Sequence, residues 1–188
     1  MSRGLSIKAW FFAPESNEAL MQRYSDTGEQ LLLEKLYEAC GEDLYHFVLT
    51  LSDPSLAKDI CQQTWLKVME KKHLYRDSGK FKAWLFTLAR NLLIDEYRSR
   101  KANLDEIDTL PAAEASMDPD KLLQRFDQAL LKLPFAQREA FCLQQEDFSL
   151  SDIASITHSN VEAVKSRLRY AKDHLRQQLS GDFETDHD

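Results

Sequence analysis

Basic residues near the C-terminal end of the chain recur every three or four positions, which places them on one face of a helix. They are Lys165, Arg169, Lys172 and Arg176. Cations in this pattern can neutralise the phosphates of a DNA duplex, while the first turns of such a helix reach base edges in the major groove. Glu162 and Ser166 lie near that end of the helix. The spacing therefore indicates a DNA-recognition helix.

A short helix and a turn precede these cations. Ser149 and Asp152 have the spacing of a capping box, which predicts a helix start, and Asn160 is a good N-cap for a longer helix of about four turns. A core helix with solvated cations is the simpler interpretation of basic residues on any one helix. The order of short helix, tight turn and long helix instead favours a helix-turn-helix that binds DNA.

A second basic segment, residues 81–101, is rich in aromatic side chains. Rings can stack on unpaired bases while cations follow the backbone, so this segment could hold opened DNA. We assign Phe81, Trp84, Leu85 and Leu88 to the hydrophobic stripe instead. The contact candidates are Lys80, Lys82, Arg90, Asn91, Tyr97, Arg98, Arg100 and Lys101, of which Lys80, Asn91, Arg98 and Arg100 are preferred.

Apolar residues recur at helical spacing almost everywhere, and no run of about six residues alternates as a strand would. One helix begins near Leu32, and Asp53-Pro54 offers an N-cap and a first-turn proline for the next. The stripe of this second helix contains Leu56, Ile60, Thr64, Trp65, Val68 and Met69, and that of the third contains Phe81, Trp84, Leu85, Leu88 and Leu92. The predicted class is all-α.

Residues 102–118 contain no basic side chain and no sustained helical period, which predicts an acidic flexible linker. We therefore expect two small helical domains joined by this linker, the second containing the helix-turn-helix. The predicted segments are an N-terminal extension at 1–15, a first domain at 16–101, the linker at 102–118, a second domain at 119–179 and an acidic tail at 180–188.

Charge is distributed unevenly along the chain, whose net charge is −7. Residues 71–101 carry nine positive and three negative side chains, whereas 102–120 carry six negative and none positive. Because neutralisation of phosphates drives affinity for DNA, the acidic segments compete for the same cations. We expect the chain to bind DNA poorly without a carrier protein.

Several function classes find no support in the sequence. Cys40, Cys61 and Cys142 are widely spaced, which predicts neither a disulfide framework nor a zinc site. No glycine-rich phosphate loop and no nucleophile–base pair is evident, so we expect no catalytic residue, no cofactor and no enzyme activity. The apolar run at residues 9–13 is too short to span a bilayer. We expect a cytoplasmic protein with no membrane association.

Two blocks of sequence resemble the extracytoplasmic-function (ECF) group of bacterial sigma factors. FKAWL at 81–85 and ARNLLID at 89–95 are similar to the group's second region, and LPFAQRE at 133–139 and VKSRLRYA at 164–171 to its fourth. The likeness covers about 160 of the 188 residues. It implies that the domain at 16–101 is a sigma region 2 domain and that the domain at 119–179 is a sigma region 4 domain.

The resemblance implies two partners, core RNA polymerase and promoter DNA. The first domain would dock on the polymerase clamp and capture the melted −10 element, with Asn91 near a flipped base. The second domain would read the −35 element. Lys165, Arg167 and Arg169 match the group's recognition-helix cations, and the full set of expected contacts is Asn160, Glu162, Lys165, Ser166, Arg167, Arg169 and Lys172.

Two departures from the group's pattern bear on function. His158 and Ser159 stand in the turn where the group commonly has glycine and an apolar residue. On the clamp-facing helix, three carboxylates are missing and a lysine is added. The expected clamp contacts are Lys58, Asp59, Gln62, Gln63 and Trp65. One hypothesis is that phosphorylation of Thr64 or Ser55 by a Ser/Thr kinase restores the charge and switches the factor on. Its alternatives are a compensating change on the polymerase and docking through Asp59 and Glu70 alone.

Other interpretations stay open at this point. A free-standing helix-turn-helix regulator would bind an operator as a dimer, and the acidic net charge counts against it. An enzyme with an appended DNA-binding unit has even less support. An anti-sigma factor is a further possible partner, which the sequence does not identify.

Overall fold

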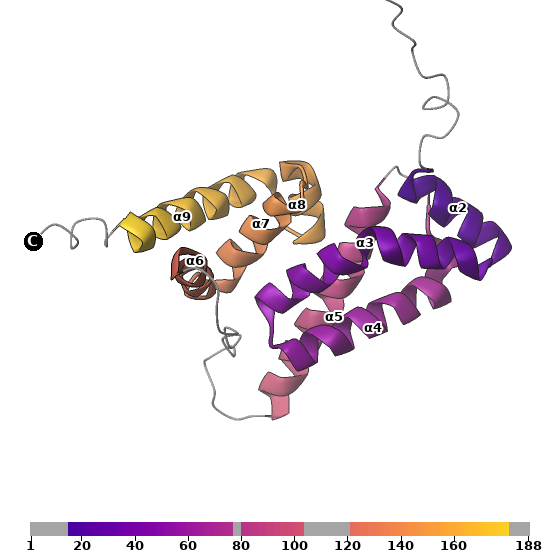
Figure 1. Cartoon of the computed structure of the whole chain (residues 1–188), viewed down its shortest axis with the longest axis horizontal. Helices are drawn as coiled ribbons and strands as arrows, with labels where there is room; N and C mark the ends of the chain where they lie inside the picture. Colours follow the sequence, from indigo (N-terminus) through magenta and orange to yellow (C-terminus); the bar gives the residue numbers. More distant parts are fainter. Residues whose placement is uncertain (1–14, 77–79, 104–120, 181–188) are drawn as a thin grey trace, which may run out of the picture.

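The computed structural model describes residues 15–76, 80–103 and 121–180, and these ranges fold into two groups of helices (Figure 1). The first half contains α2 (Asn17–Thr27), α3 (Gln30–Leu51), α4 (Pro54–Lys71), the short 3₁₀ helix η1 (Lys72–Leu74) and α5 (Phe81–Asn103). The second half contains α6 (Lys121–Leu131), α7 (Phe135–Gln145), α8 (Leu150–Ile156) and α9 (Val161–Ser180). The all-α prediction is confirmed, and the three described ranges contain no strand.

The extension at 1–14, the tail at 181–188 and most of the predicted linker lie outside the described residues. The first two linker positions belong to α5, which continues to Asn103. Helix α2 was not predicted as a separate element. Its limits carry ordinary signals, because the Ser16 side chain accepts a hydrogen bond from a first-turn amide and Gly28 ends the helix at a φ of 70°.

The predicted helix starts are confirmed. The Asp53 carboxylate accepts two backbone amides at 3.0 Å, with Pro54 in the first turn of α4. Ser149 and Asp152 form the reciprocal capping box of α8. The Asn160 side chain accepts a backbone amide of α9 at 2.7 Å. These caps satisfy amides that have no partner within their helices.

The first half packs α3 between α2, α4 and α5. The predicted stripe of α5 is partly wrong. Phe81 and Leu85 are fully buried, whereas Trp84, Leu88 and Leu92 are only partly buried, and Phe86, Ala89 and Leu93 take the fully buried positions. Since α5 contacts α3 and α4 as well as α8, its buried surface is broader than one stripe. Met69, also placed in a stripe, is 38% exposed.

In the second half, α9 packs on α6, α7 and α8. Of the apolar residues that recur at helical spacing along α9, Val164, Leu168, Ala171 and Leu175 are buried, and Val161 is partly buried against them. The turn between α8 and α9 contains His158 at a φ of 51°, in the left-handed region that favours glycine. A histidine therefore adopts the backbone conformation that a glycine would adopt more easily.

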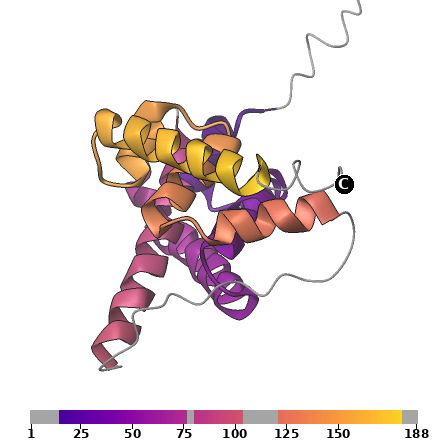
Figure 2. The ribbon, with the colours of Figure 1, turned by 90° about the vertical axis from the view of Figure 1, so that its left-hand side faces the viewer.

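The two halves are not separate in space. Helix α7 contacts α3, and α8 contacts α5. Figures 1 and 2 both show α7 and α8 lying against the side of the first half on which α3 and α5 run. Within the described ranges, no helix is long and apolar enough to cross a membrane.

The contribution of the Asp53 N-cap to the stability of α4 can be tested by mutation. We expect Asp53→Ala to lower the free energy of unfolding by about 1 kcal/mol, because two amides lose their acceptor. Chemical denaturation followed by circular dichroism would measure the change. Glu29→Ala is the matched control, since Glu29 occupies the same position before α3 without a side-chain cap. Equal losses in the two variants would contradict this account of α4.

Candidate nucleic-acid interface

Helix α5 carries the candidate contacts of the first half. Its first amide, that of Phe81, donates to the Glu18 carboxylate of α2 at 3.1 Å, which fixes where the helix begins. Phe81, Leu85 and Leu93 anchor the helix in the core. The polar positions between these anchors therefore have a defined direction, and most of them face the second half.

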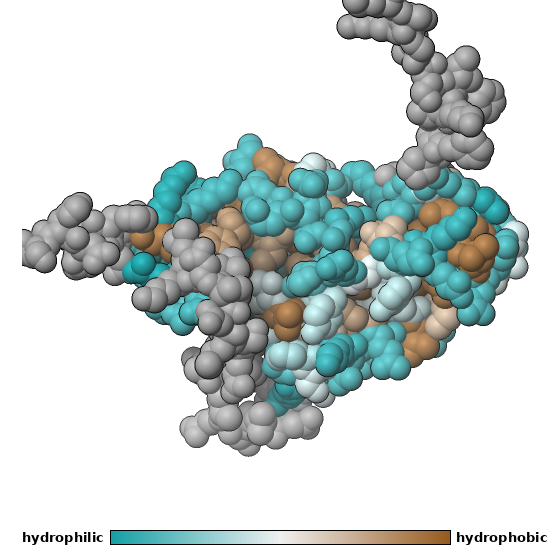
Figure 3. Space-filling view, viewed as in Figure 1, coloured by the Kyte–Doolittle hydropathy of each residue, from teal (hydrophilic) through white to brown (hydrophobic). Residues whose placement is uncertain are grey.

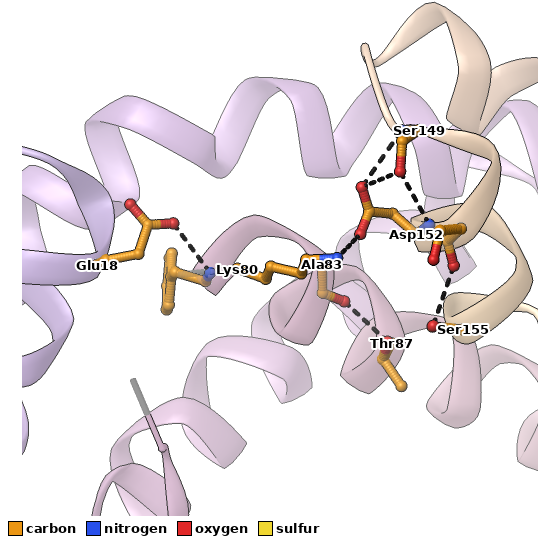
Figure 4. Close-up of polar contacts among 9 residues, drawn as sticks. Glu18, Lys80, Ala83, Thr87, Ser149, Asp152 and Ser155 are labelled. Carbon is orange, nitrogen blue, oxygen red and sulfur yellow. Dashed lines mark hydrogen bonds and ion pairs between the residues drawn. The ribbon is translucent and has the colours of Figure 1, made fainter. Parts of the chain in front are cut away.

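Lys80, immediately before α5, reaches across to α8. Its Nζ lies 2.6 Å from Oδ1 of Asp152, whose other oxygen belongs to the capping box with Ser149 (Figure 4). Burial tends to raise the pKa of the Asp152 carboxyl. The hydrogen bonds and the charge of Lys80 outweigh it and lower that pKa. The cation thus stabilises the start of the helix-turn-helix.

Lys82 lies between two carboxylates of different halves. Its Nζ is 2.7 Å from Asp43 in α3 and 3.1 Å from Glu146, which follows α7. Burial opposes its charge, but the hydrogen bonds to Asp43 and Glu146 raise the pKa of Lys82 overall. The ammonium also lies over the rings of Phe86 and Phe148, each at 5.6 Å from the centroid.

Arg90 makes the least exposed ion pair of the described residues. Its Nε lies 2.6 Å from Oε1 of Glu139 in α7, and the two side chains are 14% and 2% exposed. Burial raises the pKa of the Glu139 carboxyl, while Arg90, Arg167 and His158 act in the opposite direction. Two predicted DNA-binding arginines, one from each half, thus share this carboxylate as a charge partner.

Asn91 and Tyr97 are also engaged. The Asn91 amide oxygen lies 3.3 Å from Nε2 of His158. The Tyr97 hydroxyl donates to the Leu51 carbonyl at 2.6 Å, and its ring packs edge-on against Phe135. Burial raises the pKa of Tyr97 to about 12. In this arrangement Tyr97 connects α5 to the end of α3 rather than offering a free ring to a base.

The end of α5 is different. Arg98 and Arg100 are 78% and 44% exposed and, within the described ranges, pair with Asp95 and Glu96 on their own helix. Such exposed pairs contribute little and are easily exchanged for phosphates. The side chain of Lys101 lies outside the described residues. Among the first-half candidates whose side chains the structure describes, Arg98 is the most accessible.

On α9 the predicted cations divide between two faces. Lys165, Arg169 and Lys172 are exposed and line a shallow groove of about 350 Å³ beside the start of α8. Glu162 pairs with Lys165 at 2.8 Å. Arg167 turns the other way, donating to Ser159 and contributing to the charge around Glu139. Ser166 is half-buried, and Asn160 serves as the cap.

Helix α4 presents the expected clamp contacts. Lys58, Asp59, Gln62 and Gln63 are exposed, whereas Trp65 is 8% exposed because its ring packs against Tyr37 at 5.2 Å. Between α3 and α4 lies an apolar groove of about 390 Å³. Its lining includes Tyr37, Lys58, Cys61, Gln62, Trp65, Leu66 and Met69. Of the polar contacts predicted on α4, Lys58 and Gln62 therefore form one edge of this groove.

The sequence prediction missed the apolar part of that surface. Tyr37, Leu66 and Met69 are 59%, 45% and 38% exposed. Leu66 could have been found because it lies off the buried stripe of α4, and Tyr37 because it follows the stripe residue Leu36. Figure 3 shows hydrophobic side chains gathered at the end of the molecule where α3 begins and α4 ends.

The two candidate phosphorylation sites have opposite surroundings. The Thr64 hydroxyl is buried at 0% exposure and donates to the Ile60 carbonyl at 2.7 Å. Ser55 is exposed in the first turn of α4. A kinase can therefore reach Ser55 on the folded domain, whereas Thr64 would have to leave the core first. No metal-ligating cluster of His, Cys, Asp or Glu occurs among the described residues.

Comparison with known proteins agrees with this geometry. The family model for sigma-70 region 2 matches residues 36–103, and that for sigma-70 region 4 matches residues 123–175. The chain is 32% identical over 143 residues to the ECF sigma factor EcfG of Rhodopseudomonas palustris, covering 73% of this chain and 79% of the relative. It is also 32% identical over 158 residues to SigL of Mycobacterium tuberculosis, covering 79% and 89%.

Solved structures show the same fold. The sigma factor RpoE of Bartonella quintana, in complex with the anti-sigma factor NepR, superposes with a TM-score of 0.65 at 30% identity, covering 79% of this chain and 97% of that one. CnrH, in complex with the cytosolic domain of CnrY, superposes with a TM-score of 0.67 at 21% identity, covering 89% and 99%. The chain therefore belongs to the ECF group of RNA polymerase sigma factors, which direct the polymerase to promoters.

Proposed function

We propose that the first half docks on the clamp of core RNA polymerase and holds the melted −10 element, while the second half reads the −35 element as duplex. The observation that carries this proposal is that three candidate binding surfaces lie on three different helices in a protein of this group. An exposed row of cations lies on α9, polar and basic residues follow α5, and an apolar groove with a polar edge lies at α4.

The chemistry of each surface supports its assignment. Lys165, Arg169 and Lys172 on α9 are exposed and can meet phosphates beside a major groove. Asn91 on α5 has an amide that can hydrogen-bond to the edge of an extruded base. Extrusion costs a few kcal/mol, which the polymerase must help to offset. The net charge of −7 supports dependence on a carrier, since the chain as a whole repels DNA.

The test is run-off transcription with purified core polymerase and a library of promoter fragments. We expect specific transcripts from the wild type. Arg169→Ala should weaken binding of the polymerase complex to duplex promoter DNA and reduce the salt slope of the logarithm of affinity by about 1, because one phosphate contact is lost. Lys132→Ala removes an equal charge from the exposed end of α6 and should change neither quantity.

Two results would contradict the proposal. One is the absence of transcription together with tight duplex binding by the chain alone, which would instead support a free-standing helix-turn-helix regulator. The other is an equal effect of Arg169→Ala and Lys132→Ala on promoter affinity, which would place the duplex elsewhere than along α9.

Docking on the clamp is conditional in this protein. Lys58 and Gln63 are exposed where the group usually carries carboxylates, so the surface meets a basic clamp with less negative charge. Phosphorylation near α4 adds about 1.5–2 negative charges. Ser55 is the position that the geometry favours, because it is accessible and because a helix N-terminus stabilises an anion.

We expect Lys58→Glu to tighten binding to core polymerase roughly three- to tenfold at low salt, as one repulsive charge becomes attractive. Lys35→Glu makes the same change on the exposed side of α3 near α2 and should have little effect. Ser55→Glu should act in the same direction as Lys58→Glu. Fluorescence anisotropy of labelled protein titrated with polymerase would measure these affinities.

The hypothesis that phosphorylation switches the factor on needs a separate test. Full transcription by unphosphorylated wild-type protein, and by the Ser55→Ala and Thr64→Ala variants, would show that no phosphate is needed. Tighter polymerase binding by Lys58→Glu would still stand in that case, because it tests the charge of the surface and not its modification.

An anti-sigma factor is a further partner of the α4 surface. The relative from Bartonella quintana was solved in complex with one, and the groove of about 390 Å³ beside Trp65 can accept an apolar side chain. Such a partner would compete with polymerase for the edge formed by Lys58 and Gln62. Competition between the two for the chain can be measured in the same anisotropy assay.

A further inference from the structure

The apolar groove between α3 and α4 leaves hydrophobic side chains open to solvent. Its described lining belongs to these two helices, and Tyr37, Leu66 and Met69 are exposed along it. Exposed apolar side chains that lie together are typical of a surface that another chain or segment covers. The groove therefore has room for an occupant beyond the described residues.

A second hollow, of about 340 Å³, adjoins this groove, since Tyr37 and Trp65 line both. Leu33 adds a partly buried apolar side chain to the second hollow, and the exposed residues Glu34 and Glu38 complete its lining with two carboxylates. The combined surface is thus apolar, with negative charge on the side formed by α3. An occupant with aromatic side chains and positive charge would complement it.

Residues 1–14 have the composition that this surface requires. Trp10, Phe11 and Phe12 follow one another, and Arg3 and Lys8 are the charged residues of the segment, which contains no aspartate or glutamate. This aromatic run has no place in the surfaces proposed for DNA or for polymerase. The segment therefore matches the groove and the adjoining hollow both in its rings and in the sign of its charge.

The chain enters the described structure beside the same helix. Asn17, in the first turn of α2, donates to Sγ of Cys40 in α3 at 3.3 Å, and Glu15 lines a surface hollow together with Ala39 of α3. Trp10 is five positions before Glu15, and five extended residues span up to ~17 Å. A helix with its side chains is about 10–12 Å wide, so Trp10 can cross the exposed side of α3 and reach the groove.

We propose that the aromatic run at residues 10–12 occupies the groove between α3 and α4 of the same molecule. Trp10 packs beside Tyr37 and Trp65, and the positive charge of the segment lies near Glu34 and Glu38. Because the segment is attached to α2, its effective concentration at the groove is on the order of 1 mM, so that even a weak contact is populated. The ordering of a short segment costs conformational entropy, which keeps the contact reversible.

A partner that binds the same groove competes with the segment. Polymerase and an anti-sigma factor are the partners proposed above for this surface. The competition rests on the proposed function, whereas the docking of the segment does not.

Modification of Cys61 measures whether the groove is covered. Cys61 lines the groove and is partly exposed, whereas Cys40 and Cys142 are buried. N-ethylmaleimide adds to an accessible thiol, and peptide mass spectrometry follows each cysteine separately. Unfolding would expose all three thiols, so the rates at Cys40 and Cys142 show whether a variant stays folded.

The test variant combines Trp10→Ala, Phe11→Ala and Phe12→Ala in the whole chain. Its matched control is Phe183→Ala, which removes an aromatic side chain from residues 181–188. We expect the triple variant to raise the modification rate of Cys61 roughly three- to tenfold, with the two buried cysteines unchanged, because the groove is uncovered. The control should react as the wild type does. Equal rates for the triple variant and the wild type would overturn the proposal.

A cross-link locates the segment directly. Ala9→Cys places a thiol beside the aromatic run without changing the run itself. A short bis-maleimide reacts first at this accessible thiol, and its second maleimide is then held beside Cys61. We expect a product within one molecule, and little or none from Phe183→Cys. Equal yields from the two variants would overturn the proposal, and products that join two molecules would assign the groove to a second copy of the chain instead.

The triple variant also measures the competition with polymerase. It should bind core polymerase roughly three- to tenfold more tightly than Phe183→Ala in the anisotropy assay, because no segment has to be displaced. Unchanged polymerase affinity together with faster modification of Cys61 would contradict the proposed docking of polymerase on α4, and would leave the docking of the segment standing.

Discussion

The ion pair between Arg90 and Glu139 is the contact on which the arrangement of the two halves depends. A carboxylate that is 2% exposed is costly to bury unless a cation meets it, and Arg90 comes from the other half of the chain. If the halves separate, water must replace Arg90 around Glu139. Glu139 therefore favours the arrangement in which the two halves are in contact.

This dependence connects local chemistry with promoter use. The cations of α5 cannot pair with carboxylates of α7 and α8 and with phosphates at once. A protein with a net charge of −7 already approaches DNA unfavourably, and the contact between the halves adds a specific competitor to that general repulsion. Both effects weaken DNA binding by the free chain. Promoter selection therefore depends on the complex with polymerase rather than on the free chain.

The α4 surface, which we propose faces the polymerase, has the opposite character. Among the described residues, none of the second half lines the groove beside Tyr37 and Trp65, whereas residues of the second half cover the α5 face. The proposed docking on polymerase therefore requires no separation of α7 and α8 from α3 and α5. The charge of the α4 surface weakens this docking, because Lys58 lies among neutral amides on the edge of the groove.

The sequence by itself determined the helices and their caps, because apolar periodicity and capping residues such as Asp53 and Ser149 act over one or two turns. It also determined the family, through motifs in both halves. Only the tertiary structure decided which polar residues are available. Helical periodicity does not show that Lys80, Arg90 and Tyr97 are engaged, yet each contacts a residue distant in sequence. Thr64 is buried by the packing of α4. Such pairings depend on how helices meet, which no local spacing encodes.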